Sequence, residues 1–138
     1  MRTVYVDTGA FIAMLWSRDH HHETVRTHYR RLREERARLV TSDPVIAETA
    51  TRLRYDANLA AAQTFGAVVR DATAAGTLVV RDSDADLRAR AFDLMGRYDE
   101  LPLSYADCIG AAVASEIRAD AVFGLDNDFR VMGFALEP

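Results

Sequence analysis

The chain has 138 residues, of which 49% are hydrophobic and 28% are charged. This length predicts one domain with a full-sized core, and the composition is that of an ordinary globular protein. The single cysteine, Cys108, excludes an internal disulfide and any zinc site built from several cysteines. No apolar run approaches the roughly 20 residues that a membrane span needs, and the N-terminus has no signal-peptide core. We therefore expect a single cytoplasmic domain over residues 1–138.

The net charge of −4 hides an uneven distribution. Residues 1–54 carry ten Arg against seven Asp and Glu, whereas residues 55–138 carry seven Arg against fourteen acids. All 17 basic residues are Arg. Arginine favours bidentate contacts with phosphate, but a chain without Lys and this rich in Ala also follows from codon bias. The missing Lys therefore carries no functional weight.

The first residues predict a strand that runs directly into a helix. Val4-Tyr5-Val6 is a short apolar run that stops at Asp7, Thr8-Gly9 is a tight turn, and Ala10–Trp16 is a mostly apolar helix. A buried strand that ends in Asp is typical of the C-terminal edge of a parallel sheet, where open α/β sheets bind ligands. The structural alternative is that Asp7 caps the helix that follows.

The segment Glu23–Arg38 predicts an amphipathic helix. Val25, Tyr29 and Leu32 recur at spacings of four and three, which indicates one buried stripe. Most other positions are charged, and this pattern favours a solvated outer face over a phosphate-contacting arm. The run His20-His21-His22 falls in the preceding polar turn, and adjacent residues of a regular helix point in different directions, so a metal site is not expected there.

The middle of the chain predicts strand, helix, helix and strand. Leu39-Val40-Thr41 is a strand, and Ser42-Asp43-Pro44 then opens a helix, with a capping residue before a proline at the first helical position. Glu48 lies on that helix, where a surface pair with Arg52 at i+4 is its structural explanation. The predicted buried face of that helix consists of Val45, Ile46, Ala50 and Leu53. A further helix over Asn58–Ala75, ended by Gly76, leads to the strand Leu78-Val79-Val80.

The last third predicts two helices, a strand, a helical turn and a final strand. Ser83 is expected to cap the first helix with Asp86 as its capping-box partner, and Ser104–Ile117 forms the second. Asp107 stands in this second helix, where a capping box with Ser104 explains it structurally. The remaining predicted elements are the strand Ala121-Val122-Phe123, the carboxylates Asp126 and Asp128 after it, the helical turn Phe129–Met132, and the strand Phe134-Ala135-Leu136.

Strands that alternate with helices in this way predict an α/β fold, with a parallel sheet covered by helices on both faces. In such a sheet the predicted positions of four acids meet at one edge; these acids are Asp7, Glu48, Asp107 and Asp126. Four unpaired carboxylates in one cleft would repel one another, and a bound divalent cation removes that repulsion. Ligands that are all oxygen suit Mg²⁺ or Mn²⁺.

Four stretches of the sequence together resemble a known family. They are VYVDTGAFIA, SDPVIAETATRL, LSYADCIGAAVA and VFGLDNDFRVMGF, and they span nearly the whole chain. In this order and spacing they resemble a PIN-domain ribonuclease of the VapC toxin type. The resemblance implies a three-layer fold with sheet order 3-2-1-4-5, Mg²⁺- or Mn²⁺-dependent endoribonuclease activity, a homodimer, and inhibition by a partner antitoxin.

Carried over position by position, the resemblance also assigns roles to residues of this chain. The metal-binding and catalytic set falls on Asp7, Glu48, Asp107 and Asp126. Thr8 matches a small hydroxyl residue close to the metal, and Asp128 stands where family members vary. Three further residues, Arg30, Arg52 and Arg54, are candidates for contacts with RNA phosphates. Water activated by the metal would then cut the RNA phosphodiester and leave 5′-phosphate and 3′-hydroxyl ends.

Two kinds of alternative to a ribonuclease remain open: a binding module, and a different metal-dependent enzyme. A non-catalytic PIN-fold module could bind RNA or a protein, although it would have no reason to keep four costly carboxylates together. A metal-dependent phosphatase of the Asp-x-Asp-x-Thr kind needs an acid where this chain has Gly9, and a DNA flap nuclease is usually longer than 138 residues.

The first predicted helix also bears on the oligomeric state. Phe11, Ile12, Leu15 and Trp16 are spread too widely around it for one buried face. Part of this apolar surface is therefore expected to remain exposed and to form the dimer interface.

Overall fold

The computed structural model describes residues 1–138 and contains one five-stranded sheet, with the strand order β3-β2-β1-β4-β5. All four neighbouring strand pairs are parallel. The elements in chain order are β1 (Thr3–Val6), α1 (Thr8–Leu15), α2 (His22–Glu34), β2 (Arg38–Ser42), α3 (Asp43–Arg52), the π-helix η1 (Leu53–Ala57), α4 (Leu59–Ala74), β3 (Leu78–Arg81), α5 (Ala85–Arg97), α6 (Tyr105–Glu116), β4 (Ala121–Phe123), α7 (Asp128–Val131) and β5 (Leu136–Glu137). The predicted α/β class and the sheet order 3-2-1-4-5 are confirmed.

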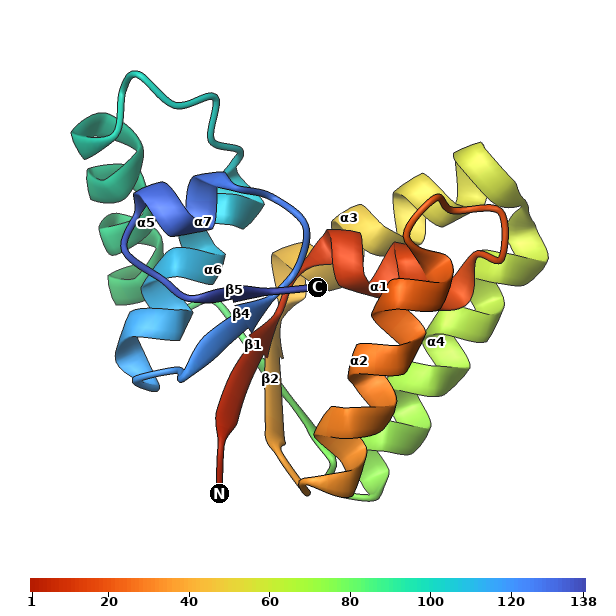
Figure 1. The fold of residues 1–138 in the computed structure, drawn as a ribbon. Coiled ribbons are helices and arrows are strands. Elements are labelled where there is room, and N and C mark those ends of the chain that lie inside the picture. The colour runs from red at the N-terminus through yellow and green to blue at the C-terminus, as the bar shows by residue number, and fades with distance from the viewer.

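Helices cover both faces of the sheet. Figure 1 shows α1, α2 and α4 on one side and α5 and α6 on the other, while α3 contacts α1, α4 and α6. β1 is the central strand, and Val4, Tyr5 and Val6 are each 1% exposed or less, because alternate side chains enter the two layers. Since β1, β2 and β4 run parallel, the residues that follow them meet at one edge of the sheet.

Two predicted elements have different ends in the structure. The helix predicted over Glu23–Arg38 ends at Glu34, because Arg36 adopts a φ of 55° and the Ala37 N–H donates to the Leu32 carbonyl at 3.0 Å. The last strand was predicted over residues 134–136 but occupies Leu136–Glu137. Phe134 instead donates its N–H to the Phe129 carbonyl at 3.0 Å, so it closes the α7 turn rather than pairing with β4.

The predicted helix caps are partly wrong. Ser42 does stand at the start of α3, but its hydroxyl bonds to the Tyr5 hydroxyl at 2.9 Å instead of capping the helix. α5 is capped by Asp84 rather than Ser83, and the Asp84 carboxylate accepts the Leu87 N–H at 2.8 Å. Side-chain partners of this kind depend on the tertiary fold, which local sequence spacing does not specify.

The apolar first helix is largely covered by the rest of the protein. Phe11 and Ile12 are buried, while Leu15 and Trp16 are half-buried and pack against the core. Any leftover apolar surface on this helix is therefore confined to its last residues, and the dimer interface stays a prediction. No helix of the structure is both long and apolar enough to cross a membrane.

Candidate active site

Asp7 is the buried centre of the site. It follows β1 directly, its N–H donates to the Phe123 carbonyl of β4 at 3.0 Å, and the residue is 5% exposed. It stands at the N-cap position of α1, yet its carboxylate makes no capping hydrogen bond, so the interpretation of Asp7 as only a helix cap was wrong. A Cβ placed on Gly124 would lie 3.1 Å from the Asp7 Cβ. The chain just after β4 therefore passes close to Asp7, and a larger residue at position 124 would require a shift of a few tenths of an ångström.

Asp126 and Asp107 reach the site from the second half of the chain. Asp126 follows β4, and its Oδ1 accepts the Asp128 N–H at 2.9 Å. Asp107 lies in the first turn of α6, where its Oδ2 accepts the Ser104 N–H at 2.9 Å and its own N–H donates to the Ser104 hydroxyl at 3.0 Å. The predicted capping box is thus confirmed. It engages one oxygen of Asp107 and leaves Oδ1 without a hydrogen bond within the protein.

The carboxylates share one cleft of about 300 Å³ at the C-terminal edge of the sheet. All four predicted acids line this cleft, and so does Thr8; Asp128 does not. The complete lining consists of Asp7, Thr8, Gly9, Ile12, Asp19, Glu48, Arg52, Asp107, Leu125 and Asp126. The predicted convergence of carboxylates from four separate segments is therefore present.

Asp19 is a fifth acid in this cleft that the sequence did not indicate. It comes from the loop between α1 and α2, and its Oδ1 accepts the His21 N–H at 2.8 Å. The other cleft acids follow strands or begin helices, whereas Asp19 follows a helix in a polar turn. Loop acids of that kind are common on protein surfaces, so nothing in the sequence distinguished this one.

The cleft acids have no cationic partners. None of them forms an ion pair with any Arg, His or N-terminal amine. Arg52 also lines the cleft, but the Glu48–Arg52 pair, which was the structural alternative for Glu48, is absent from these ion pairs. Burial raises the pKa of Asp7 to about 7. The Thr8 N–H opposes this rise, and Asp107, Glu48 and Asp126 each add a smaller increase. Burial likewise raises the pKa of Asp107, opposed by its hydrogen bonds to Ser104.

The arrangement offers oxygen donors to a cation. The Thr8 Oγ1 is buried beside Asp7 and has no hydrogen-bond partner. Carboxylate and hydroxyl oxygens are the ligands that Mg²⁺ and Mn²⁺ prefer. No three His, Cys, Asp or Glu side chains already surround a single point in the structure. Mg²⁺ is usually bound by one or two carboxylates and keeps several water ligands, which the oxygen donors of this cleft suit.

The remaining predicted residues lie elsewhere. Arg30 is exposed on α2, and Arg54 is exposed in η1; neither lines the cleft. In the histidine run, the Nδ1 of His22 lies 2.7 Å from the Ala13 carbonyl oxygen, which gives this residue a structural contact between α2 and α1.

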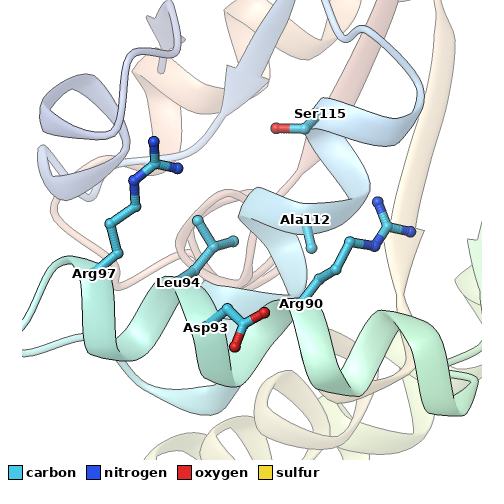
Figure 2. A pocket seen from close by; sticks show the side chains of 6 residues that line it. All are labelled: Arg90, Asp93, Leu94, Arg97, Ala112 and Ser115. Carbon is cyan, nitrogen blue, oxygen red and sulfur yellow. The ribbon is translucent and has the colours of Figure 1, made fainter.

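A second hollow of about 270 Å³ lies between α5 and α6 (Figure 2). In Figure 2, Arg90 and Arg97 rise from one face of α5 on either side of Leu94. Its lining consists of Arg90, Asp93, Leu94, Arg97, Ala112 and Ser115. This hollow contains none of the predicted site residues, so the cleft at the sheet edge remains the candidate active site.

The sheet order and the unpaired carboxylates at its C-terminal edge define an α/β protein with an acidic cleft at the edge where such sheets bind ligands. The model of the PIN domain family matches residues 4–135. The chain therefore belongs to the PIN domain family.

Solved structures give the same fold. VapC20 of Mycobacterium tuberculosis, described as a sarcin–ricin loop cleaving toxin, is 28% identical with a TM-score of 0.84, over 98% of this chain and 99% of that one. VapBC2 of Rickettsia felis, bound to promoter DNA, is 14% identical with a TM-score of 0.72, covering 98% and 97% of the two chains. FitAcB of Neisseria gonorrhoeae is 18% identical with a TM-score of 0.65, covering 98% and 96%. Among curated protein sequences, none matches significantly.

Proposed function

We propose that this protein is a divalent-metal-dependent endoribonuclease, the toxin of a VapBC-type toxin–antitoxin pair. The observation that carries the proposal is the convergence of four carboxylates, without one ion-pairing partner, in a single cleft. Membership of the PIN domain family supports nuclease chemistry. The 28% identity to VapC20 over nearly the whole chain supports RNA as the substrate.

The cleft residues would divide the work between binding a cation and binding RNA. Asp7, Glu48, Asp107 and Asp126 would hold Mg²⁺ or Mn²⁺ directly or through water, and the unpartnered Thr8 hydroxyl would assist them. When bound, the cation lowers the pKa of a coordinated water and neutralises charge on the phosphoryl group. Arg52 has no acid partner and can bind a backbone phosphate at the cleft. Asp128 does not line the cleft, so it would act only through its N–H bond to Asp126.

A cleavage assay tests this function. The purified protein is incubated with a hairpin RNA that carries the sarcin–ricin loop, in Mg²⁺, in Mn²⁺ or in excess EDTA. We expect one main cut that depends on metal, leaves a 5′-phosphate, and is lost in Asp107→Asn. An RNA that binds and is never cut in either metal would instead indicate the non-catalytic binding module.

The proposed partners are the RNA substrate, an antitoxin and a second copy of the chain. The acidic cleft suits an antitoxin segment that brings Arg or Lys to Asp7 and Asp107, where it would replace the cation. Such a segment should bind less tightly as Mg²⁺ rises, beyond the effect of monovalent salt at the same ionic strength. Sedimentation at micromolar concentration tests the homodimer, and a monomer there would contradict it.

A further inference from the structure

Tyr55 is exposed to an extent that its role in the fold does not explain. Of the five Tyr, Tyr5 is buried, Tyr29, Tyr98 and Tyr105 are half-buried, and Tyr55 alone is exposed, at 78%. Its ring meets no other aromatic ring, and the one side chain recorded over it is Arg54, whose Cζ lies 5.7 Å from the ring centroid. An exposed aromatic ring with a guanidinium beside it offers planar groups on which another planar group can stack.

The backbone places Tyr55 three residues after Arg52, which lines the acidic cleft. Tyr55 lies in η1, where the Asn58 N–H reaches back to the Leu53 carbonyl at 2.9 Å. Such π-turns are rare and recur at functional sites. Arg52, one residue before η1, lines the cleft itself, so Tyr55 follows within about one helical turn, roughly 5 Å along the axis. Figure 1 shows the yellow junction of α3 and α4 at the same end of the molecule as the loop after α1, which carries Asp19.

We propose that Tyr55 and Arg54 form a base-stacking subsite for one unpaired nucleotide of the RNA substrate, next to the phosphate that Arg52 binds. This inference rests on the proposed ribonuclease function and adds to it a requirement for an unstacked base near the cut. Sequence-specific RNA recognition uses loop and single-stranded bases that stack on aromatic rings and on Arg planes. Stacking accepts any base, because every base has a π-face.

The charges around Tyr55 favour RNA over a protein surface as the occupant. Arg52 and Arg54 both precede the ring in sequence, are exposed, and form no ion pair with any acid of the chain, while the exposed Asp56 follows the ring, so the local charge is positive on balance. A ring with Arg54 over it and the unpaired Arg52 nearby match a stacked base and its adjoining phosphate. The apolar surface nearby is small: Leu59, at 50% exposure, is the one exposed large aliphatic residue in the next turn.

Binding measurements with modified RNA test the subsite. The probe is the sarcin–ricin hairpin, intact or with a single abasic nucleotide at each loop position, and cleavage is prevented by placing every variant in the Asp7→Asn background with Mg²⁺. We expect Tyr55→Ala to bind intact RNA about tenfold more weakly, whereas Tyr55→Phe and Tyr55→Trp retain the parent affinity. One abasic position should weaken parent binding similarly and abolish the difference between parent and Tyr55→Ala.

The matched control is Phe92→Ala, which removes another exposed ring, 59% exposed and outside the cleft, and should leave the affinity unchanged. The fluorescence of Tyr55→Trp, measured with Trp16→Phe to remove the one other Trp, should be quenched by the intact RNA and not by the matching abasic RNA.

Equal affinities of parent and Tyr55→Ala for every RNA would overturn the subsite while leaving the nuclease standing. A change of sedimentation in Tyr55→Ala with unchanged RNA affinity would overturn it in favour of a contact between copies of the chain. A parent that neither binds nor cuts RNA would overturn both proposals.

Discussion

Two groups of carboxylates in this protein are built in opposite ways. On the α5 and α6 side, Glu116 accepts hydrogen bonds from Arg81 at 2.9 Å and from Arg90 at 3.2 Å. The Arg81 hydrogen bond lowers the pKa of Glu116. Asp84 accepts from Arg81 at 3.1 Å, and its pKa is lowered first by the Leu87 N–H and then by Arg81. These acids stabilise the fold as anions.

The cleft acids lie at the end of the same sheet and accept backbone hydrogen bonds but none from an Arg side chain. Burial and the other carboxylates push the pKa of Asp7 up, to about 7. The chain has 17 Arg, so the absence of ion pairs at these acids does not follow from a lack of basic residues. Even Arg52, which lines the cleft, pairs with none of them. A buried acid without an Arg partner destabilises the folded protein. Such unpaired acids are expected in a site that binds a metal cation from solution.

The largest expected effect comes from removing one cleft charge. Asp7→Asn should lower metal-dependent RNA cleavage by more than about 100-fold, because even residues that only support metal ligands contribute about 10–100-fold. Without metal, its melting temperature should equal or exceed that of the parent, since the substitution relieves repulsion and a desolvated charge. Cleavage rates and thermal melting in EDTA measure the two effects.

The control for Asp7→Asn is Asp93→Asn, which removes an exposed charge from the other hollow (Figure 2). Its cleavage rate should match that of the parent. If Asp7→Asn melts well below the parent and still cuts RNA, Asp7 is structural and the cleft is not the active site.

The pH dependence of stability should have opposite signs for the two groups of acids. Because the pKa of Asp7 rises from 3.8 to about 7, the metal-free folded protein binds more protons than the unfolded chain between those values. Its stability should therefore fall as the pH rises from about 4 to about 7, by on the order of 4 kcal/mol. Urea unfolding in EDTA measures this fall, and Mg²⁺ at pH 8 should restore stability.

The difference between parent and Asp7→Asn isolates this contribution. Groups common to both proteins cancel in that difference, including His28, whose pKa is lowered by burial. A constant difference between the two proteins from pH 4 to pH 8 would mean that Asp7 titrates as an ordinary exposed acid.

Much of the fold could be predicted from the sequence, because its signals are local. Val4-Tyr5-Val6 and Ala121-Val122-Phe123 are short apolar runs with acids after them, and parallel strands necessarily bring those acids to one edge. What failed depended on contacts between distant segments. The Ser42 hydroxyl bonds to Tyr5, on another strand, instead of capping a helix. Asp19 enters the cleft from a loop that has no regular sequence pattern. The strand order itself came from the resemblance, since alternation of strands and helices does not specify it.

A smaller effect is expected from the packing that holds the cleft elements together. Tyr5 lies between β2 and α6: its hydroxyl bonds to Ser42, and a Cβ on Gly110 would lie 2.9 Å from its ring and hydroxyl. Gly110→Ala should therefore cost about 1–3 kcal/mol of unfolding free energy through overpacking. Because Gly110 is one turn after Asp107, cleavage should fall as well. Urea unfolding of the two proteins measures this cost, and equal stability of parent and Gly110→Ala would mean that the Tyr5 ring can shift to make room for the added methyl group.

The smallest expected effect tests the paired side of the comparison. Glu116→Gln removes the carboxylate that Arg81 and Arg90 share, but these side chains are 29–41% exposed, so water and salt screen the pairs. The loss of stability at pH 7 should be about 0.2–1 kcal/mol, and the cleavage rate should not change.

The pKa of Glu116 is lowered from 4.5 in the folded protein, so its contribution is present at neutral pH and is lost as the pH falls below that value. The parent should therefore lose more stability than Glu116→Gln on acidification, the reverse of the comparison with Asp7→Asn. Urea unfolding at pH 7 and near pH 3 measures both differences. A large loss of cleavage in Glu116→Gln would mean that a paired acid far from the cleft supports the site, and the two groups would no longer be distinct.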